Sequence, residues 1–280
     1  MRILVTNDDG IEAPGLHVLG AAVAAAGHDT VVAAPTDDMS GASASIWRMH
    51  HDAHLDVAPV TLDLAPRIPA WSVDASPGLI VLTATLGAFG PEPDVVLSGI
   101  NAGLNTGESI LHSGTVGAVL TAQRLGLYAM AISLEPGSPW TWSIAADMAL
   151  DQLPRLLEAP PATALNLNVP HSRSKPSLRH ARLNPHGTVR TAAIAPQPDP
   201  RLQLEVRTRG PSPPADSDAA LLAAGYATLT SITGVHEQVQ PPAPSEQPRP
   251  RTERSLRHAP AAEHEARVGA PERATPLPHR

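Results

Sequence analysis

The first 170 residues alternate between short apolar runs and longer segments whose apolar residues recur at helical spacing. The apolar runs, residues 3–6, 30–34, 94–98, 129–134 and 164–169, each predict a strand. The segments 16–26, 78–89, 115–125 and 143–157 predict helices, the last of which should end or kink near Pro154. Strands without a polar face must be covered on both sides, so this alternation predicts an α/β fold: a parallel sheet with helices on both faces.

The rest of the chain differs in composition. A proline-rich stretch from Pro196 to Pro214 surrounds the short apolar run 202–206, which predicts an extended arm or loop. Residues 241–280 contain nine prolines and seven arginines but few large aliphatic residues. Such a segment buries too little apolar area to offset the entropy lost on ordering. We therefore predict a disordered Pro/Arg-rich tail over residues 238–280.

Composition also excludes several functions. The absence of cysteine excludes thiolate metal sites and cysteine nucleophiles, and the single lysine, Lys175, argues against a P-loop or Schiff-base lysine. An aromatic content of 2% and a net charge of −7 argue against a nucleic acid polymer as partner. No apolar run reaches the roughly 18 residues that span a membrane. Since Met1–Val5 reads as a strand rather than a signal peptide, we expect a cytoplasmic protein with no membrane partner.

Ligands of parallel α/β sheets bind outside the carboxyl ends of the strands. The first such loop here is Asn7-Asp8-Asp9-Gly10, where two adjacent carboxylates repel each other unless a cation lies between them. Hard oxygen ligands of this kind suit Mg²⁺, Mn²⁺ or Ca²⁺. A polar turn with an Asp helix cap is the alternative. The position after the first strand favours the metal site.

Two further loops follow strands at this edge. Ser40, in the small-residue loop 35–45, can supply a neutral oxygen to a metal. The third loop carries Gly99, Gly103 and Gly107 and leads into Ser113-Gly114-Thr115, which opens a predicted helix and can bind an anion through backbone N–H groups. An ordinary Ser/Thr cap does not explain so many glycines. An acid pair for a cation beside an anion-binding helix start suggests metal-assisted phosphoester chemistry.

These motifs together resemble the SurE survival-protein family of nucleoside-monophosphate phosphohydrolases. The resemblance covers about residues 1–237 and rests on the stretches Ile3–Gly10, Ala13–Gly15, Ser40–Ser43, Ser98–Gly103, Ser113–Val116, Leu165–Pro170 and Asp216–Tyr226. It implies a Rossmann-like core and one domain over 1–237, with a dimerisation arm at about 185–215.

The resemblance also implies site residues. By matching position, the metal ligands are Asp8, Asp9, Ser40 and Asn101. The residues near the substrate phosphate are Asn101, Ser113, Gly114 and Thr115. One divalent ion, Mg²⁺ or Mn²⁺, would activate water for hydrolysis of nucleoside 5′-monophosphates, with Asp8 or Asp9 accepting the proton. The sequence does not distinguish these two carboxylates. A homodimer is the expected assembly.

Two alternatives remain open. The scarcity of aromatic residues leaves room for a broad-specificity phosphatase or a short-chain polyphosphatase that uses the same site. The segment Ala75–Ile80 lacks an Asp that the family usually has, and prolines replace the family's terminal helix. These departures leave room for a non-catalytic protein that binds a nucleotide or phosphate.

Overall fold

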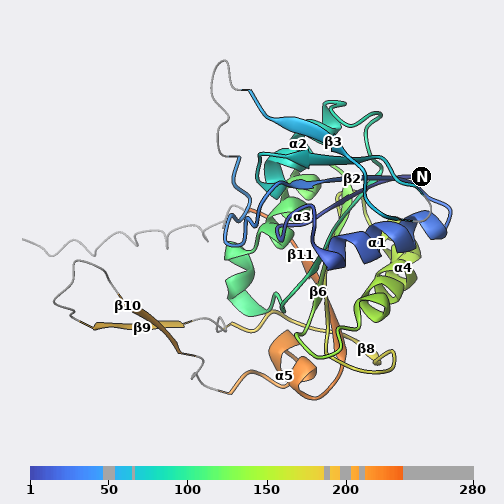
Figure 1. Ribbon diagram of the computed structural model, residues 1–280. Helices are drawn as coiled ribbons and strands as arrows, with labels where there is room; N and C mark the ends of the chain where they lie inside the picture. The colour runs from blue at the N-terminus through green and yellow to red at the C-terminus, as the bar shows by residue number, and fades with distance from the viewer. Residues whose placement is uncertain (47–53, 65–66, 186–189, 196–202, 208–211, 236–280) are drawn as a thin grey trace, which may run out of the picture. The chain divides into compact units, whose positions relative to one another are not determined.

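The computed structural model describes residues 1–46, 54–64, 67–185, 190–195, 203–207 and 212–235. A nine-stranded sheet with the strand order β3-β4-β2-β1-β5-β6-β7-β11-β8 forms its centre (Figure 1). Its strands are β1 (Arg2–Thr6), β2 (Asp29–Pro35), β3 (Val57–Val60), β4 (Ala70–Val73), β5 (Val95–Asn101), β6 (Tyr128–Leu134), β7 (Ala164–Val169), β8 (Leu178–His180) and β11 (Ala227–Ile232). The described helices are α1 (Pro14–Ala25), α2 (Pro77–Thr85), α3 (Gly114–Arg124), α4 (Trp142–Glu158), α5 (Asp218–Ala223) and the 3₁₀ helix η1 (Gly107–His112).

The predicted α/β fold with a largely parallel sheet is confirmed. Strands β4, β2, β1, β5, β6 and β7 are parallel neighbours, and all five predicted strands are among them. Two antiparallel pairings were not predicted: β3 pairs with β4, and β11 pairs with β7. Strand β8 then adds to β11 in parallel. The sheet is therefore mixed towards both of its edges.

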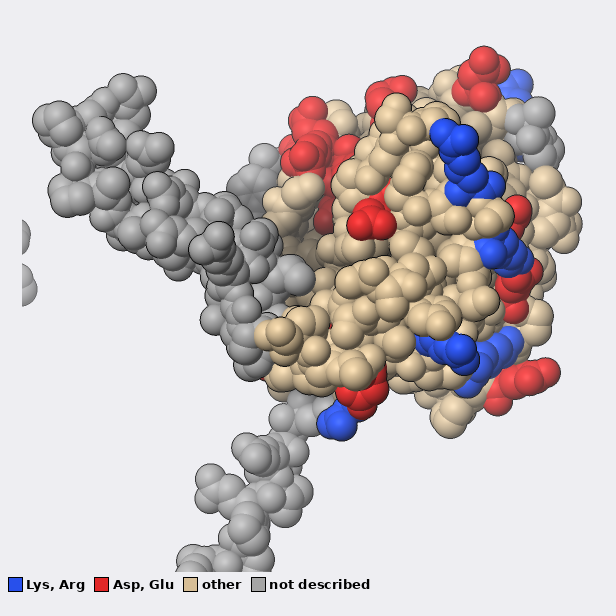
Figure 2. Space-filling view, turned by 90° about the horizontal axis from the view of Figure 1, so that it is seen from below, with Lys and Arg blue, Asp and Glu red and all other residues tan. Residues whose placement is uncertain are grey.

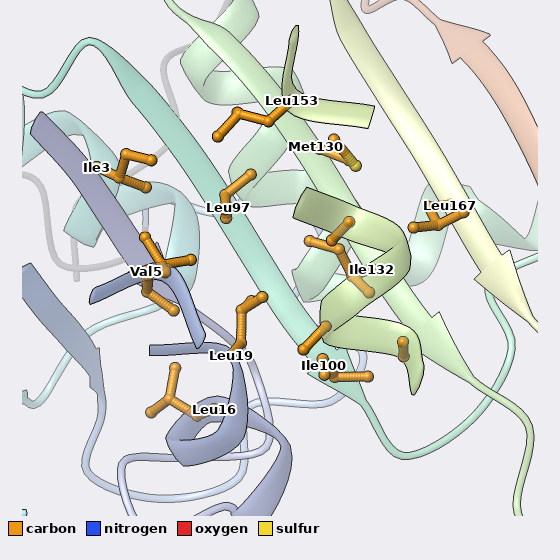
Figure 3. Close-up of a cluster of buried hydrophobic side chains, with 14 of the residues drawn as sticks. Ile3, Val5, Leu16, Leu19, Leu97, Ile100, Met130, Ile132, Leu153 and Leu167 are labelled. Atoms are coloured by element: carbon orange, nitrogen blue, oxygen red, sulfur yellow. The ribbon is translucent and has the colours of Figure 1, made fainter. Parts of the chain in front are cut away.

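Buried side chains alternate between the two faces of the sheet. In β1, Ile3 and Val5 join the core under α1 and α4, whereas Leu4 joins the core under α2 and α3. Figure 3 shows the first of these clusters, with Leu16 and Leu19 of α1 packed over the central strands. Both faces are thus apolar, which is why the strands read as continuous apolar runs.

The four predicted helices are present, but two of them end elsewhere than expected. Helix α2 ends at Thr85, four residues before the end of the predicted segment 78–89. Helix α4 does not end at Pro154 but continues to Glu158. Its last turns carry Leu153 and Leu156, which are 3% and 0% exposed. Burial of these two side chains offsets the hydrogen bond that proline removes from the helix.

The predicted arm contains a separate two-stranded antiparallel sheet. Strand β9 (Arg190–Ala195) pairs with β10 (Gln203–Arg207), and β10 overlaps the apolar run 202–206. The chain divides into two units, Met1–His236 and Glu237–Arg280. The predicted tail over 238–280 lies outside the described residues, and its disorder stays a prediction.

Within the described ranges, none of the helices combines the length and apolarity that crossing a bilayer requires. The surface carries charges of both signs. On the face drawn in Figure 2, Lys and Arg side chains gather mainly along one side, and the middle of that face is largely uncharged.

Candidate active site

The acid pair lies in a tight turn at the carboxyl end of β1. Asn7 is fully buried, and its Nδ2 donates to the Gly10 carbonyl oxygen at 2.9 Å, which closes the turn around Asp8 and Asp9. The Met39 amide donates to the Asp8 carbonyl oxygen at 2.7 Å and so joins the loop after β2 to this turn. The turn that carries the two carboxylates is therefore fixed by a hydrogen bond within it and by one from the loop after β2.

Asp8 lies directly against the N-terminus of α3. The Thr115 hydroxyl donates a hydrogen bond to Asp8 Oδ1, and both side chains are buried. A Cβ placed on Gly114 would lie 2.7 Å from Asp8 Cβ and 2.9 Å from Asp8 Oδ2, so only glycine fits at this position. The structure thus brings together a carboxylate and a helix start that are separated by more than 100 residues in the chain.

A β-bulge turns Asn101 towards this cluster. Ser98 pairs with Ala131 and Asn101 with Ser133, so three residues of β5 oppose two of β6. The extra residue reverses the alternation of side chains, which places Asn101 on the sheet face that α3 covers. Asn101 Nδ2 donates to the Gly103 carbonyl oxygen at 2.6 Å, and Asn101 Oδ1 lies 3.5 Å from Thr115 Oγ1. The amide oxygen of Asn101 therefore faces the same cluster as Asp8.

Asp9 has a perturbed carboxyl group. Its burial, together with the charge of Asp8, raises the pKa of Asp9 from 3.8 to about 6. A hydrogen bond from the Ala102 amide acts in the opposite direction, and Asp38 adds a further increase. Asp9 Oδ2 is buried and has no hydrogen-bond partner among the described residues. A carboxylate held in this way is stabilised by a cation.

The residues of this cluster fit a divalent cation. Besides Asp9 Oδ2, the buried Asn7 Oδ1 also lacks a hydrogen-bond partner within the described ranges. The available donors are carboxylate and amide oxygens, which suit hard cations. In the described part of the chain, no three His, Asp or Glu side chains lie close enough together to hold one metal ion. A cation here would thus need neutral oxygens, such as that of Asn101, and water to complete its coordination.

Ser40 and Ser113 are placed differently from the other predicted site residues. Ser40 is exposed one residue after Met39, and its amide donates to Asp38 Oδ1 at 2.8 Å. Ser113 is the N-cap of α3, and its Oγ accepts a hydrogen bond from the Val116 amide at 3.2 Å. The Ser113 hydroxyl is therefore used for capping. The first N–H groups of a helix have no partner inside it, so those at the start of α3 can donate to an anion.

Three polar residues that were not predicted as site residues fix the loop between Asn101 and Ser113. Asn105 donates its amide to Asn168 Oδ1 at 2.8 Å, and its carbonyl oxygen accepts from Asn166 Nδ2 and Asn168 Nδ2 at 2.9 and 2.8 Å. Asn166 and Asn168 belong to the motif Leu165–Pro170, which gave no indication of this role. Their place in an otherwise apolar buried strand was the signal available.

A second anchor comes from α5. Asp218 is 0% exposed, and its Oδ2 accepts from the Gly107 amide at 2.8 Å. Its Oδ1 accepts from the amides of Asn184 and Ala219 at 2.9 and 2.7 Å. Asp218 therefore connects the segment before α3 to the chain at Asn184, close to the start of the arm. Three hydrogen bonds compensate the burial of its charge.

The sequence of this chain is similar to one family of known proteins over most of its length. The profile of the family described as "Survival protein SurE" matches residues 3–192. The protein named 5′-nucleotidase SurE from Xanthomonas campestris pv. campestris (strain B100) is 37% identical over 243 residues, which is 84% of this chain and 90% of the relative. The protein of the same name from Picosynechococcus sp. is 32% identical and covers 83% of this chain, with 91% of the relative matched.

A solved structure agrees with these sequence matches. The crystal structure of the SurE protein from Aquifex aeolicus superposes with a TM-score of 0.67 at 26% identity. The match covers 83% of this chain and 93% of that structure. The fold, the motifs and the similarity over most of the chain lead to one conclusion: this chain belongs to the SurE survival-protein family.

Proposed function

We propose that this protein is a divalent-metal-dependent 5′-nucleotidase that hydrolyses nucleoside 5′-monophosphates to nucleoside and phosphate. The relatives of the same family are named 5′-nucleotidase SurE. One observation carries the proposal: the start of α3, which can bind phosphate, lies directly against Asp8 through Thr115 and Gly114. A phosphate bound there would lie beside the acid pair.

The residues of the site have separate roles. The free N–H groups at Gly114 and Thr115 bind the phosphoryl oxygens, and the helix dipole stabilises their charge. Asp8, Asp9, Asn101 and Ser40 supply the oxygens that would hold Mg²⁺ or Mn²⁺. A divalent ion at this position supplies Lewis-acid polarisation of a phosphoryl oxygen and of water.

Hydrolysis then needs one proton acceptor. Water attacks phosphorus, the bond from phosphorus to the 5′-oxygen breaks, and the leaving oxygen takes a proton from solvent. We assign the acceptance of the proton of water to Asp9, because the Thr115 hydroxyl already occupies Asp8 Oδ1 and Asp9 Oδ2 has no partner among the described residues.

A phosphatase assay tests this function. We expect hydrolysis of AMP and GMP with Mn²⁺ or Mg²⁺ and none with EDTA. Asp8→Asn should abolish turnover, whereas Glu92→Gln, which changes an exposed acidic residue just before β5, should not. Faster hydrolysis of p-nitrophenyl phosphate or tripolyphosphate than of any nucleotide would favour the broad phosphatase. Metal binding without turnover of any phosphoester would favour the non-catalytic alternative.

We also propose that the protein is a homodimer that uses the arm. A two-stranded hairpin such as β9–β10 is marginally stable by itself, and among the described strands each of the two pairs only with the other, so a second copy can cover its remaining edge. Light scattering after gel filtration should give the mass of a dimer. Thr191→Pro, which removes a backbone donor in β9, should shift the mass towards a monomer. A monomeric wild-type protein would reject this assembly.

A further inference from the structure

We propose that the exposed ring of Trp140 is a stacking platform for the base of the nucleotide substrate, a proposal that rests on the proposed nucleotidase function. The chemical class that it would recognise is a planar heteroaromatic ring attached to a phosphorylated sugar. Trp140 was not among the predicted site residues, and the sparse aromatic content had suggested a site without a base pocket.

The first argument is the position of the loop that carries Trp140. Residues 135–141 follow β6 at the carboxyl edge of the sheet, where the acid pair also lies. Asn101 pairs with Ser133 in the sheet register, so this loop begins two residues after the direct neighbour of Asn101. The loop that carries Trp140 and the site residue Asn101 therefore lie at the ends of two adjacent strands, β6 and β5.

The second argument is the geometry of a tryptophan pair. The rings of Trp140 and Trp142 are stacked, with a centroid separation of 4.4 Å and an angle of 5° between their planes. Trp140 remains 40% exposed although Trp142 covers one of its faces. A large, flat apolar ring is thus supported on one face by Trp142 and still has exposed surface on which a ligand can stack.

The third argument is the fixed position of the supporting ring. A Cβ placed on Gly15 would lie 3.1 Å from Trp142 Cζ3 and 2.1 Å from the Ile100 carbonyl oxygen. Trp142 therefore packs between the first turn of α1 and the end of β5, one residue before Asn101. Figure 3 places Ile100 at the same end of the core as Leu16 of α1. The supporting ring is therefore packed next to the residue that precedes Asn101.

The arrangement matches the two ends of a nucleoside monophosphate. The start of α3 lies on one face of the sheet, whereas Trp142, the first residue of α4, packs against the core on the other face. Asn101 lies at the strand end between them. A phosphate at α3 would direct its sugar and base across this edge towards Trp140. Stacking on an aromatic face tolerates every base. We therefore expect a strong preference for nucleotides over phosphate esters without a base, and weak discrimination among bases.

The test compares AMP with ribose 5-phosphate, which has the sugar and phosphate but no base. Removal of one stacking residue weakens binding of a base by about 5-fold or more. Trp140→Leu should therefore raise KM for AMP by about 5-fold or more with kcat nearly unchanged, and leave kcat/KM for ribose 5-phosphate unchanged. Trp140→Phe should restore most of the affinity for AMP. Leu86→Ala, which removes an exposed apolar side chain at the end of α2, should change neither substrate.

Calorimetry in EDTA makes the test independent of catalysis. The affinity for AMP should fall in Trp140→Leu, and the affinity for ribose 5-phosphate should not. If the wild-type protein hydrolyses no ester but shows this pattern, the nucleotidase function fails and the base platform stands. If AMP and ribose 5-phosphate are affected equally, or neither is affected, the platform is wrong, whatever the activity. Thermal melting shows whether each variant is folded before it is compared.

Discussion

Replacing Asp9 by Asn should stabilise the metal-free protein and at the same time weaken metal binding and catalysis. The folded state disfavours the Asp9 carboxylate because of its burial and the adjacent charge of Asp8, which raise its pKa from 3.8 to about 6. Each pKa unit corresponds to about 1.36 kcal/mol, so the ionised group destabilises the fold by at most about 3 kcal/mol. Asp9 is only partly buried, and solvent screening reduces the expected gain to about 1–2 kcal/mol.

The sign of the effect depends on pH. The folded state binds the proton of Asp9 more tightly than the unfolded state, so wild-type stability decreases as pH rises from about 4 to about 6 and is then constant with respect to this group. Below about pH 4 the two proteins should be equally stable, and above about pH 6 the metal-free Asn variant should be more stable by the full amount. In a chain of this size, 1–2 kcal/mol corresponds to about 2–8 °C in Tm.

The assay is thermal melting of both proteins in EDTA and in Mn²⁺, over a pH series, with AMP hydrolysis alongside. Mn²⁺ should raise the Tm of the wild type because it binds the native state, and should raise that of the variant less. Glu92→Gln is the control for removal of an acidic charge from the surface. The reasoning is refuted if the metal-free variant is less stable than the wild type at neutral pH, or if it retains full activity.

Three further predictions concern the surroundings of the site. Gly114→Ala should reduce turnover by about 10-fold or more and lower Tm, because the new Cβ would collide with Asp8. Helix propensity alone would raise stability by about 1 kcal/mol, so a higher Tm would contradict the close contact. Asp218→Asn should destabilise the protein by about 1–3 kcal/mol in denaturant unfolding, because an amide cannot accept from all three backbone donors. The control is Asp216→Asn at an exposed position, and equal effects of both variants would contradict the role of Asp218 as an anchor. Deletion of residues 238–280 should leave Tm and turnover unchanged, since their composition cannot support a core, and a large loss of either would reject this view.

The central strands and helices were predictable because each is encoded locally. The run 164–169 coincides with β7, and the runs 3–6, 30–34 and 129–134 lie within β1, β2 and β6. The run 94–98 begins one residue before β5 and stops three residues short of its end. The strands that were missed give a weaker local signal. Strands β3 and β11 add antiparallel pairings near the two edges of the sheet, and their short segments carry no strong period of their own. A proline in the middle of β3, at Pro59, further obscures that strand in the sequence.

The residue types of the candidate site could be predicted from the sequence, but the contacts that hold them in place could not. Asp8 and Asp9 follow β1 and Asn101 is the last residue of β5, so the rule that parallel strands end at one edge is enough to bring them together. The contact between Gly114 and Asp8 depends on the exact path of α3 over the sheet, which no local pattern specifies. The bulge that turns Asn101 is likewise a property of two paired strands rather than of one segment.

The long-range anchors explain why a glycine-rich loop can serve as a positioned site. Between Asn101 and Ser113 the chain is held at Asn105 by residues 61 and 63 positions later, and at Gly107 by Asp218, 111 positions later. Without these contacts, ordering the loop around a ligand would cost about 1–2 kcal/mol per residue at the moment of binding. With them, the conformational entropy is lost on folding, and the start of α3 is in place before a phosphate arrives. Weakening either anchor should therefore raise KM even at temperatures where the variant is still fully folded. That result distinguishes positioning of the site from general stabilisation of the fold.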